Sequence, residues 1–139
     1  MNKSRKRIAY VTYAGVFPFY LSPISDYFDY NEILFRILKI ETFSSLYAAL
    51  IVCFLSGMQW QKLIETNMKG KFFFIPFLPL FLASTYTFYD NEIYSSSILV
   101  LSLFLSLLID LMIYKKKSEN WFKKLRISAT ILAAVSFLI

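Results

Sequence analysis

The chain has 139 residues, of which 58% are hydrophobic, 19% aromatic and only 17% charged, with a formal net charge of +6. A soluble domain of this size has too much surface per volume to bury so many apolar side chains, so the composition indicates a membrane protein of a single domain. The chain has no histidine and one cysteine, Cys53. This excludes zinc fingers, histidine-based catalytic triads and an intrachain disulfide.

Long runs without a charged side chain organise the sequence. A helix needs roughly 17–25 mainly apolar residues to cross the ~30 Å hydrocarbon layer, and four runs supply this length. The fifth is shorter and has to recruit residues from 121–126. Strands of a membrane barrel would instead alternate apolar and polar residues over ~10 positions. The sequence therefore predicts an all-α, polytopic membrane helix bundle of about five transmembrane helices, over residues 8–25, 42–61, 72–89, 93–114 and 125–139.

The first run and the connection after it each allow two interpretations. A basic start followed by an apolar stretch is also typical of a signal peptide, but Pro18 interrupts the run and no small-residue cleavage pattern follows. Residues 26–41 place tyrosine and aliphatic side chains at three- and four-residue spacing. This spacing suits a short amphipathic helix at the membrane surface. The alternative is an extension of the second span.

Basic residues predict the orientation of the chain. The N-terminus and the connections after the second and fourth runs carry four, three and six of them, whereas the other two connections carry two and none. Positive charge accumulates on the untranslocated side, so we expect the N-terminus inside and the C-terminus outside, most simply in a bacterial inner membrane. The basic loops are candidate contacts for anionic lipid headgroups, and no nucleic-acid partner is expected.

The second and third runs contain helix-shaping residues. Ser45, Ala49, Cys53 and Gly57 recur every four residues and form a ridge of small side chains on which another helix can pack closely. The serines of the fourth run are the expected mate of this ridge, and a cofactor groove is the less favoured interpretation. In the third run, prolines 76 and 79 are expected to bend the helix near its start.

The second run ends in FLSGMQWQK, residues 54–62, which raises the question of a ligand site. Gln59 and Gln61 flank Trp60, but they lie about 200° apart on a helix and cannot both face one ligand unless the helix ends there. The simpler interpretation is a membrane exit, with Trp60 at the interface and Lys62 reaching the headgroups.

Asp110 is the one acidic residue within a predicted span, and Ser102 and Ser106 precede it at four-residue intervals. Carboxylates inside membranes often mark proton or ion paths. However, Asp110 lies five residues before Lys115. A structural pair with a neighbouring lysine, or with a Trp or Tyr donor, is therefore the favoured alternative.

Three stretches carry a family resemblance: YAGVFPFYL at 13–21, YAALIVCFLSGMQWQ at 47–61 and WFKKLRISATILAAVSFLI at 121–139. They resemble the small integral membrane proteins of unknown function related to animal transmembrane protein 69, which also occur in bacteria. The middle signature of that family resembles Y-x-A-x-I-L-S-F-L-G-G-x-x-W-G. Here Ser56 and Gln61 replace two of its glycines, and the matching residues are Tyr47, Ala49, Phe54, Leu55, Gly57 and Trp60. The resemblance implies a polytopic protein of roughly five helices and carries over no activity.

The sequence thus favours a non-enzymatic membrane protein that acts through helix packing, as a homo-oligomer or as an accessory subunit of a membrane protein partner. The alternative is a small transporter or lipid-handling protein with a polar cavity on its inner side, and a membrane enzyme comes third. No metal ligands and no cofactor are predicted. The candidate functional or packing residues are Gly57, Gln59, Trp60, Gln61, Ser102, Ser106 and Asp110.

Overall fold

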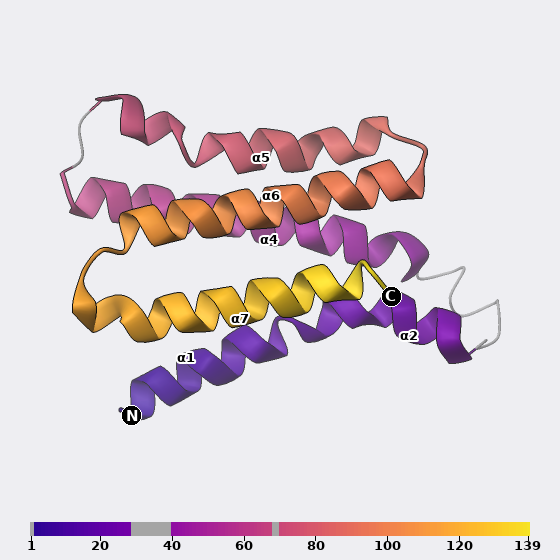
Figure 1. Cartoon of the computed structure of the whole chain (residues 1–139), viewed down its shortest axis with the longest axis horizontal. Coiled ribbons are helices and arrows are strands. Elements are labelled where there is room, and N and C mark those ends of the chain that lie inside the picture. Colours follow the sequence, from indigo (N-terminus) through magenta and orange to yellow (C-terminus); the bar gives the residue numbers. More distant parts are fainter. Residues whose placement is uncertain (1, 29–39, 68–69) are drawn as a thin grey trace.

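Helices make up every regular element of the part of the chain that the structure describes. The structure is a computed structural model, and it describes residues 2–28, 40–67 and 70–139. The helices lie side by side along the long axis of the molecule, and the two termini lie at opposite ends (Figure 1). The prediction of an all-α bundle is therefore confirmed.

The helices of the described residues form five columns. In chain order they are α1 (Lys3–Ala14), η1 (Phe17–Tyr20) and α2 (Leu21–Phe28); α4 (Ile40–Glu65); η2 (Gly70–Phe74), α5 (Phe77–Ser84) and η3 (Thr85–Phe88); α6 (Glu92–Ile113); and, after η4 (Lys117–Glu119), α7 (Asn120–Ser136).

Three helical segments among the described residues are long and apolar enough to cross a membrane: Phe43–Glu65, Gly70–Phe88 and Glu92–Ile113. The other two columns depart from a simple span. The first is broken between α1 and η1, and α7 has 17 residues, or about 25 Å at 1.5 Å per residue. The predicted amphipathic helix over 26–41 falls largely on residues 29–39, outside the described residues.

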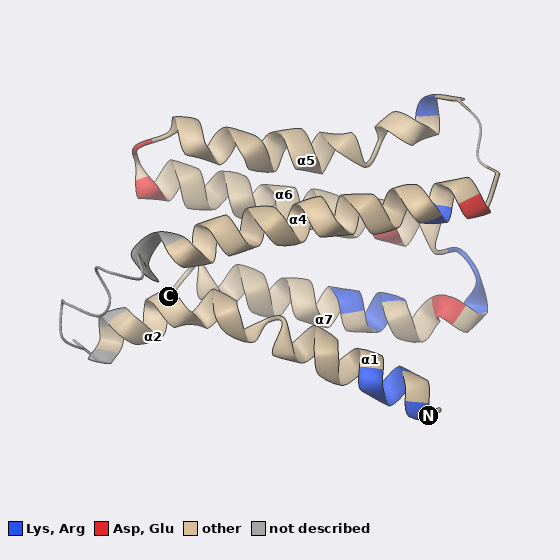
Figure 2. Ribbon diagram, turned by 180° about the vertical axis from the view of Figure 1, so that it is seen from behind, with Lys and Arg blue, Asp and Glu red and all other residues tan. Residues whose placement is uncertain are grey.

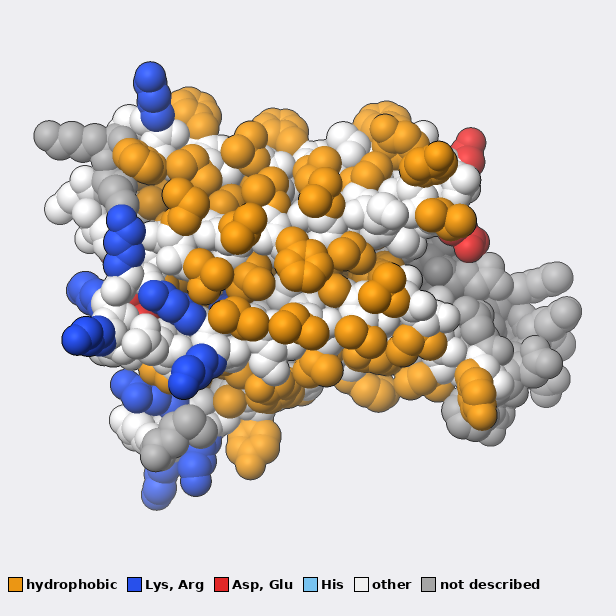
Figure 3. All heavy atoms as spheres, viewed as in Figure 1, with side chains coloured by type: hydrophobic (Ala, Val, Ile, Leu, Met, Phe, Trp, Pro, Cys, Tyr) orange, Lys and Arg blue, Asp and Glu red, His pale blue; other side chains and the backbone are white. Residues whose placement is uncertain are grey.

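Apolar and charged side chains are separated along the long axis, as expected for a protein that crosses a bilayer. Apolar side chains cover the middle of the face in Figure 3, where they form a belt across several helices. Lysine and arginine gather at the end that holds the N-terminus and the α6–α7 connection, whereas acidic residues mark the α5–α6 turn at the opposite end (Figure 2). The α6–α7 connection, which is rich in basic residues, and the α5–α6 turn, which has none, thus lie at opposite ends of the bundle.

Two groups of helices build the core. α4, α5 and α6 pack against one another, while α7 packs against α6, α1 and η1. The central cluster combines small and large residues, namely Phe19, Ala48, Val52, Ala83, Leu99, Leu103 and Ala133. Small side chains let helix backbones come close, which is how membrane helices associate when lipid removes the hydrophobic driving force.

Hydroxyl groups of α4 donate hydrogen bonds to backbone carbonyls at the break in the first column. Pro18 has no amide hydrogen, so the turn around Gly15 cannot keep a regular helical ladder. The Tyr47 hydroxyl donates to Gly15 O at 2.8 Å, and the Ser44 hydroxyl donates to Phe19 O at 3.2 Å. Backbone carbonyls freed inside a membrane protein need such partners because hydrocarbon offers none. These two hydrogen bonds therefore hold the backbone on both sides of the break, at Gly15 and Phe19, against α4.

Proline also shapes the third column, as the sequence predicts. Pro76 caps the N-terminus of α5, and Pro79 lies buried in its first turn. The short 3-10 segments η2 and η3 extend this column at its two ends (Figure 1).

Candidate functional site

Four polar side chains meet in the interior where α4, α6 and α7 converge. They are Gln59 from α4, Ser106 and Asp110 from α6, and Arg126 from α7. Each is buried, with 0%, 0%, 4% and 7% of its surface exposed, respectively. We call these four residues the polar cluster.

An ion pair between α6 and α7 is the strongest contact of the polar cluster. Arg126 Nε donates to Asp110 Oδ2 at 2.6 Å. Arg126 can reach it because α7 starts at Asn120, which places the arginine six residues, or about 9 Å, inside the helix. The sequence led us to expect a lysine, or a Trp or Tyr donor, as the partner of Asp110. That expectation is wrong, because the partners lie inside the bundle and are Arg126 and Gln59.

Gln59 joins α4 to the same carboxylate. Its Nε2 donates to Asp110 Oδ1 at 2.8 Å and to Ser106 O at 2.9 Å. Exchanging the amide oxygen and nitrogen would turn an acceptor toward these two acceptors, so the contacts define the amide orientation. Both oxygens of Asp110 are thus engaged. The helix continues past Trp60 to Glu65, and Gln61 bonds Glu65 on the exposed side, so the two glutamines do point in different directions.

Arg126 keeps hydrogen-bonding capacity that the polar cluster does not use. Its Nη2 is buried and has no hydrogen-bond partner among the described residues. A guanidinium carries five N–H donors in a rigid plane, and an unpaired buried donor costs about 1–3 kcal/mol. The Nη2 group of Arg126 is therefore available to a further acceptor.

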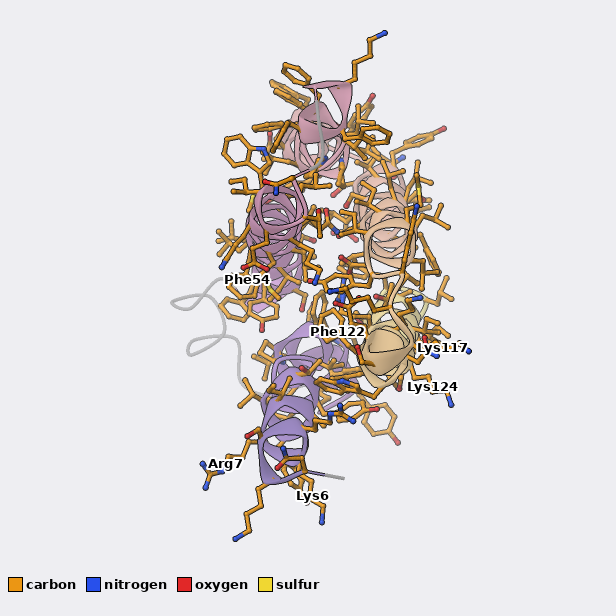
Figure 4. All side chains as sticks on the ribbon, turned by 90° about the vertical axis from the view of Figure 1, so that its left-hand side faces the viewer. Lys6, Arg7, Phe54, Lys117, Phe122 and Lys124 are labelled. Atoms are coloured by element: carbon orange, nitrogen blue, oxygen red, sulfur yellow. The ribbon has the colours of Figure 1, made fainter. Side chains whose placement is uncertain are left out.

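Arg126 lines a groove between α1, α4 and α7 with a volume of about 550 Å³. The remaining lining is mainly apolar and comes from all three helices, including Ile8, Val11, Phe54, Leu55, Ala129 and Ala133. Figure 1 shows α1 diverging from α7 toward the N-terminus, and Figure 4, a view along the bundle, shows Phe122 between α4 and α7. The groove thus follows from the break near Gly15, beyond which α1 inclines away from the bundle.

The remaining predicted residues lie apart from this groove. Ser102 is buried, but its hydroxyl donates to Leu99 O of its own helix at 2.7 Å. Trp60 is 43% exposed and packs edge-on against Phe77, with 5.2 Å between ring centroids. Gly57 is exposed, and a Cβ at this position would meet no atom within 4 Å.

The small-residue ridge does not meet the serines of α6. Cys53 and Gly57 are exposed, whereas Val52, Ser56 and Gln59 on the neighbouring face are buried. Gln59, rather than the ridge, contacts Ser106. The expected pairing of ridge and serines is therefore wrong.

A second ion pair ties the basic ends of α4 and η4 together. Lys62 Nζ lies 2.7 Å from Glu119 Oε1 and 5.3 Å from the centre of the Tyr114 ring. The hydrogen bond from Lys62 lowers the pKa of Glu119 below its ordinary value. This pair closes the α6–α7 connection over α4.

Comparison with known families places the chain. A family described as "Protein of unknown function (DUF3429)" matches residues 4–139. The chain belongs to this family. No significant match was found among curated proteins or among solved structures. The family match agrees with the predicted membership of a family of unknown function, and it supplies no activity.

The sequence did not predict Arg126 as a member of the site, because its charge belongs to the basic connection that precedes the last run and predicts the orientation of the chain. The signal was present, since that run has 13 charge-free residues and needs 121–126 to approach a full span. Extending the helix in this way carries Arg126 to the depth of Asp110.

We expect Asp110→Asn to destabilise the protein strongly. The substitution leaves the Arg126 charge buried without its counter-ion, and breaking a buried pair by removing one partner costs roughly 3–5 kcal/mol. The double variant Asp110→Asn/Arg126→Gln removes both charges and should recover much of this loss. Thermal unfolding of the detergent-solubilised protein measures both, and a double variant less stable than Asp110→Asn alone would contradict the pairing.

We expect the Lys62–Glu119 pair to contribute stability near neutral pH and to lose it in acid. A carboxyl group with a lowered pKa stabilises the fold above its ordinary pKa, and the contribution disappears as the pH falls through the lowered value. Glu119→Gln should therefore cost about 0.2–1 kcal/mol, as exposed pairs do, at neutral pH and nothing in strong acid. Unfolding midpoints of both proteins at the two pH values test this. Glu65→Gln, which keeps an acceptor for Gln61, is the control and should show no such difference.

Proposed function

We propose that the protein crosses a bacterial inner membrane five times, with its N-terminus inside and its C-terminus outside. Two structural features support this topology: the termini lie at opposite ends of the bundle (Figure 1), and most of the described basic residues lie at its N-terminal end (Figure 2). An odd number of crossings separates the termini, and the positive end stays in the cytoplasm. The relation to transmembrane protein 69 stays a prediction from the quoted motifs.

Within this topology, we propose that the protein binds a membrane amphiphile in the groove between α1, α4 and α7 and performs no catalysis. The groove itself is the observation that carries this proposal. Its volume of about 550 Å³ lies within the range of small-molecule sites. A mainly apolar lining with a single buried charged group at one end matches a molecule with a chain and a polar head.

The position of the groove suits a ligand that arrives from the bilayer. Val11 and Phe54 at its rims are 73% and 64% exposed, whereas Leu103 and Ala133 at its floor are each 3% exposed. The groove thus opens on the apolar flank of the bundle. A lipid-like molecule can enter sideways without passing through water.

The polar cluster supports a binding role over acid–base chemistry. Both oxygens of Asp110 accept hydrogen bonds, from Gln59 and Arg126. A general base must lie within hydrogen-bond reach of the reacting proton, and Asp110 is 4% exposed and is not among the residues that line the groove. Asp110 instead serves to hold Arg126 in place.

An accessory role through helix packing is the second candidate. Cys53 and Gly57 face outward on α4, and the space beside Gly57 is open. A ridge of this kind is a surface on which a helix of a partner, or of a second copy, can pack. The two roles use different faces of α4 and can be tested separately.

The topology predicts which cysteines an impermeant maleimide reaches in intact cells. With Cys53 replaced by alanine, a cysteine at Asp90 should be labelled from outside, because Asp90 is an exposed residue of the α5–α6 turn. A cysteine at Ser118, an exposed residue of the basic end, should react only after permeabilisation. The reverse pattern would invert the orientation, and equal labelling of both sites would contradict the separation of the two ends.

The groove predicts one saturable site for a long-chain amphiphile. Ala129→Phe places a ring in the groove, since Ala129 is 6% exposed and lines it. We expect this variant to abolish saturable binding of radiolabelled hexadecanol by protein in phosphatidylcholine nanodiscs. Val11→Trp, which fills the groove from its exposed α1 rim, should weaken binding without disturbing the core.

Two controls separate the candidate roles. Leu132→Phe places the same ring on α7 at a 40% exposed position outside the groove and should leave hexadecanol binding unchanged. Gly57→Leu should change only the oligomeric state or partner capture, if the ridge is used. Unaltered hexadecanol binding in both groove variants would contradict the groove as the site.

A further inference from the structure

We propose that the amphiphile bound in the groove is a long-chain carboxylate, whose carboxylate group binds the guanidinium of Arg126. This inference rests on the proposed amphiphile-binding function and names the class of its ligand. Three observations carry it: the unused donor of Arg126, the charge of the site, and the path of the groove along α7.

Arg126 offers an unused hydrogen-bond donor to the ligand. Arg126 uses Nε for Asp110, while its buried Nη2 has no partner among the described residues and the side chain lines the groove. A guanidinium presents its N–H groups in one plane, in a geometry that matches the two oxygens of a carboxylate. Because Asp110 holds Nε, the plane of the Arg126 guanidinium and the position of its unused Nη2 are set before a ligand arrives.

Arg7 gives the groove one positive charge beyond the Asp110–Arg126 pair. Asp110 and Arg126 compensate each other, and Gln59 and Ser106 are neutral. Arg7 adds a further positive charge at the basic end of the groove, and its side chain points outward from α1 (Figure 4). A singly charged anion therefore balances the groove, and Arg7 attracts it at the mouth without needing to contact it.

The groove's path supplies a place for the chain. Arg126, Ala129, Thr130 and Ala133 all line it, at the three- and four-residue spacing of one helix face. The small side chains beyond Arg126 line the groove along α7 for about 10 Å, and the buried Phe19 of η1 lines it as well. A chain attached to a head at Arg126 can thus run along α7 toward the middle of the membrane.

The burial of Arg126 selects a small head. The residue is 7% exposed and lies six residues inside α7. A carboxylate can reach a buried nitrogen, whereas a phosphodiester that carries glycerol on both sides must bring polar groups into the apolar part of the groove. Burying such groups without partners is unfavourable.

Three probes that share one saturated chain test the head group: palmitate, hexadecanol and palmitoyl lysophosphatidylglycerol. Equilibrium binding of each is measured on the full chain in phosphatidylcholine nanodiscs. We expect palmitate to bind roughly ten- to a hundredfold more tightly than hexadecanol, the ratio that one charge-assisted hydrogen bond supports. Lysophosphatidylglycerol should bind more weakly than palmitate.

Variants assign the preference to Arg126. Asp110→Asn/Arg126→Gln keeps the shape of the cluster without charge and should make palmitate and hexadecanol bind equally. Lys124→Gln is the matched control, since Lys124 belongs to the same helix end but points away from the groove (Figure 4). It should retain the full preference. Should the double variant not fold, Arg126→Lys removes the planar fork and is expected to lower palmitate affinity alone.

Each result bears on a different claim. Equal binding of palmitate and hexadecanol by the unaltered protein, or a preference that survives both Arg126 variants, overturns the carboxylate assignment and leaves the groove as an amphiphile site. Tighter binding of lysophosphatidylglycerol than of palmitate also overturns the assignment and points to a phosphodiester lipid. Saturable binding of none of the probes contradicts the proposed function itself.

Discussion

The ion pair between Asp110 and Arg126 is the constraint on which the arrangement of the bundle depends. A buried charge without its counter-ion is unfavourable, so each of the two helices requires the other. Gln59 adds α4 to the pair. Three helices are thereby fixed in rotation and in depth by a single carboxylate, where apolar contacts alone would allow many similar packings.

This arrangement also determines where the molecule remains open. α7 is held toward α6 by Arg126, and η1 is held on α4 by the hydroxyls of Ser44 and Tyr47. Between these two attachments, the axis of α1 inclines away from the bundle. Two side-chain contacts still connect α1 to α7: Arg5 lies over the Trp121 ring, and the Tyr13 hydroxyl donates a hydrogen bond to Ser128. The groove is the space that remains between α1, α4 and α7, because the contacts that hold these helices leave it unfilled.

Sequence patterns predicted the helical class because composition and run length act independently of tertiary packing. They also predicted that Gln59 and Gln61 face different directions, since this follows from helix periodicity alone. The partner of Asp110 escaped prediction for a physical reason: Lys115 is near in sequence, whereas Arg126 becomes near only when α7 folds back along α6.

The groove was equally hidden from the sequence. Pro18 indicated a bend, but its direction depends on which carbonyls α4 satisfies. In the same way, the ridge of small residues on α4 was recognisable as a packing surface. The neighbour of this ridge depends on the rotation of α4 about its axis. Gln59 sets that rotation, because its hydrogen bond turns the Gln59 face of α4 toward Ser106.

In the proposed five-span topology, the short connection between α6 and α7 has a consequence for how the chain enters the membrane during synthesis. Arg126 follows Asp110 by 16 residues, and each charge alone costs about 2.5–3.5 kcal/mol on transfer of a helix into the bilayer. Insertion of α6 and α7 together as a hairpin avoids both costs, because the charges neutralise each other before they meet hydrocarbon. The C-terminal helix, too short and too basic at its start to be a strong insertion signal by itself, is then carried in by its predecessor. In that topology, insertion of the α6–α7 hairpin also completes the wall of the groove.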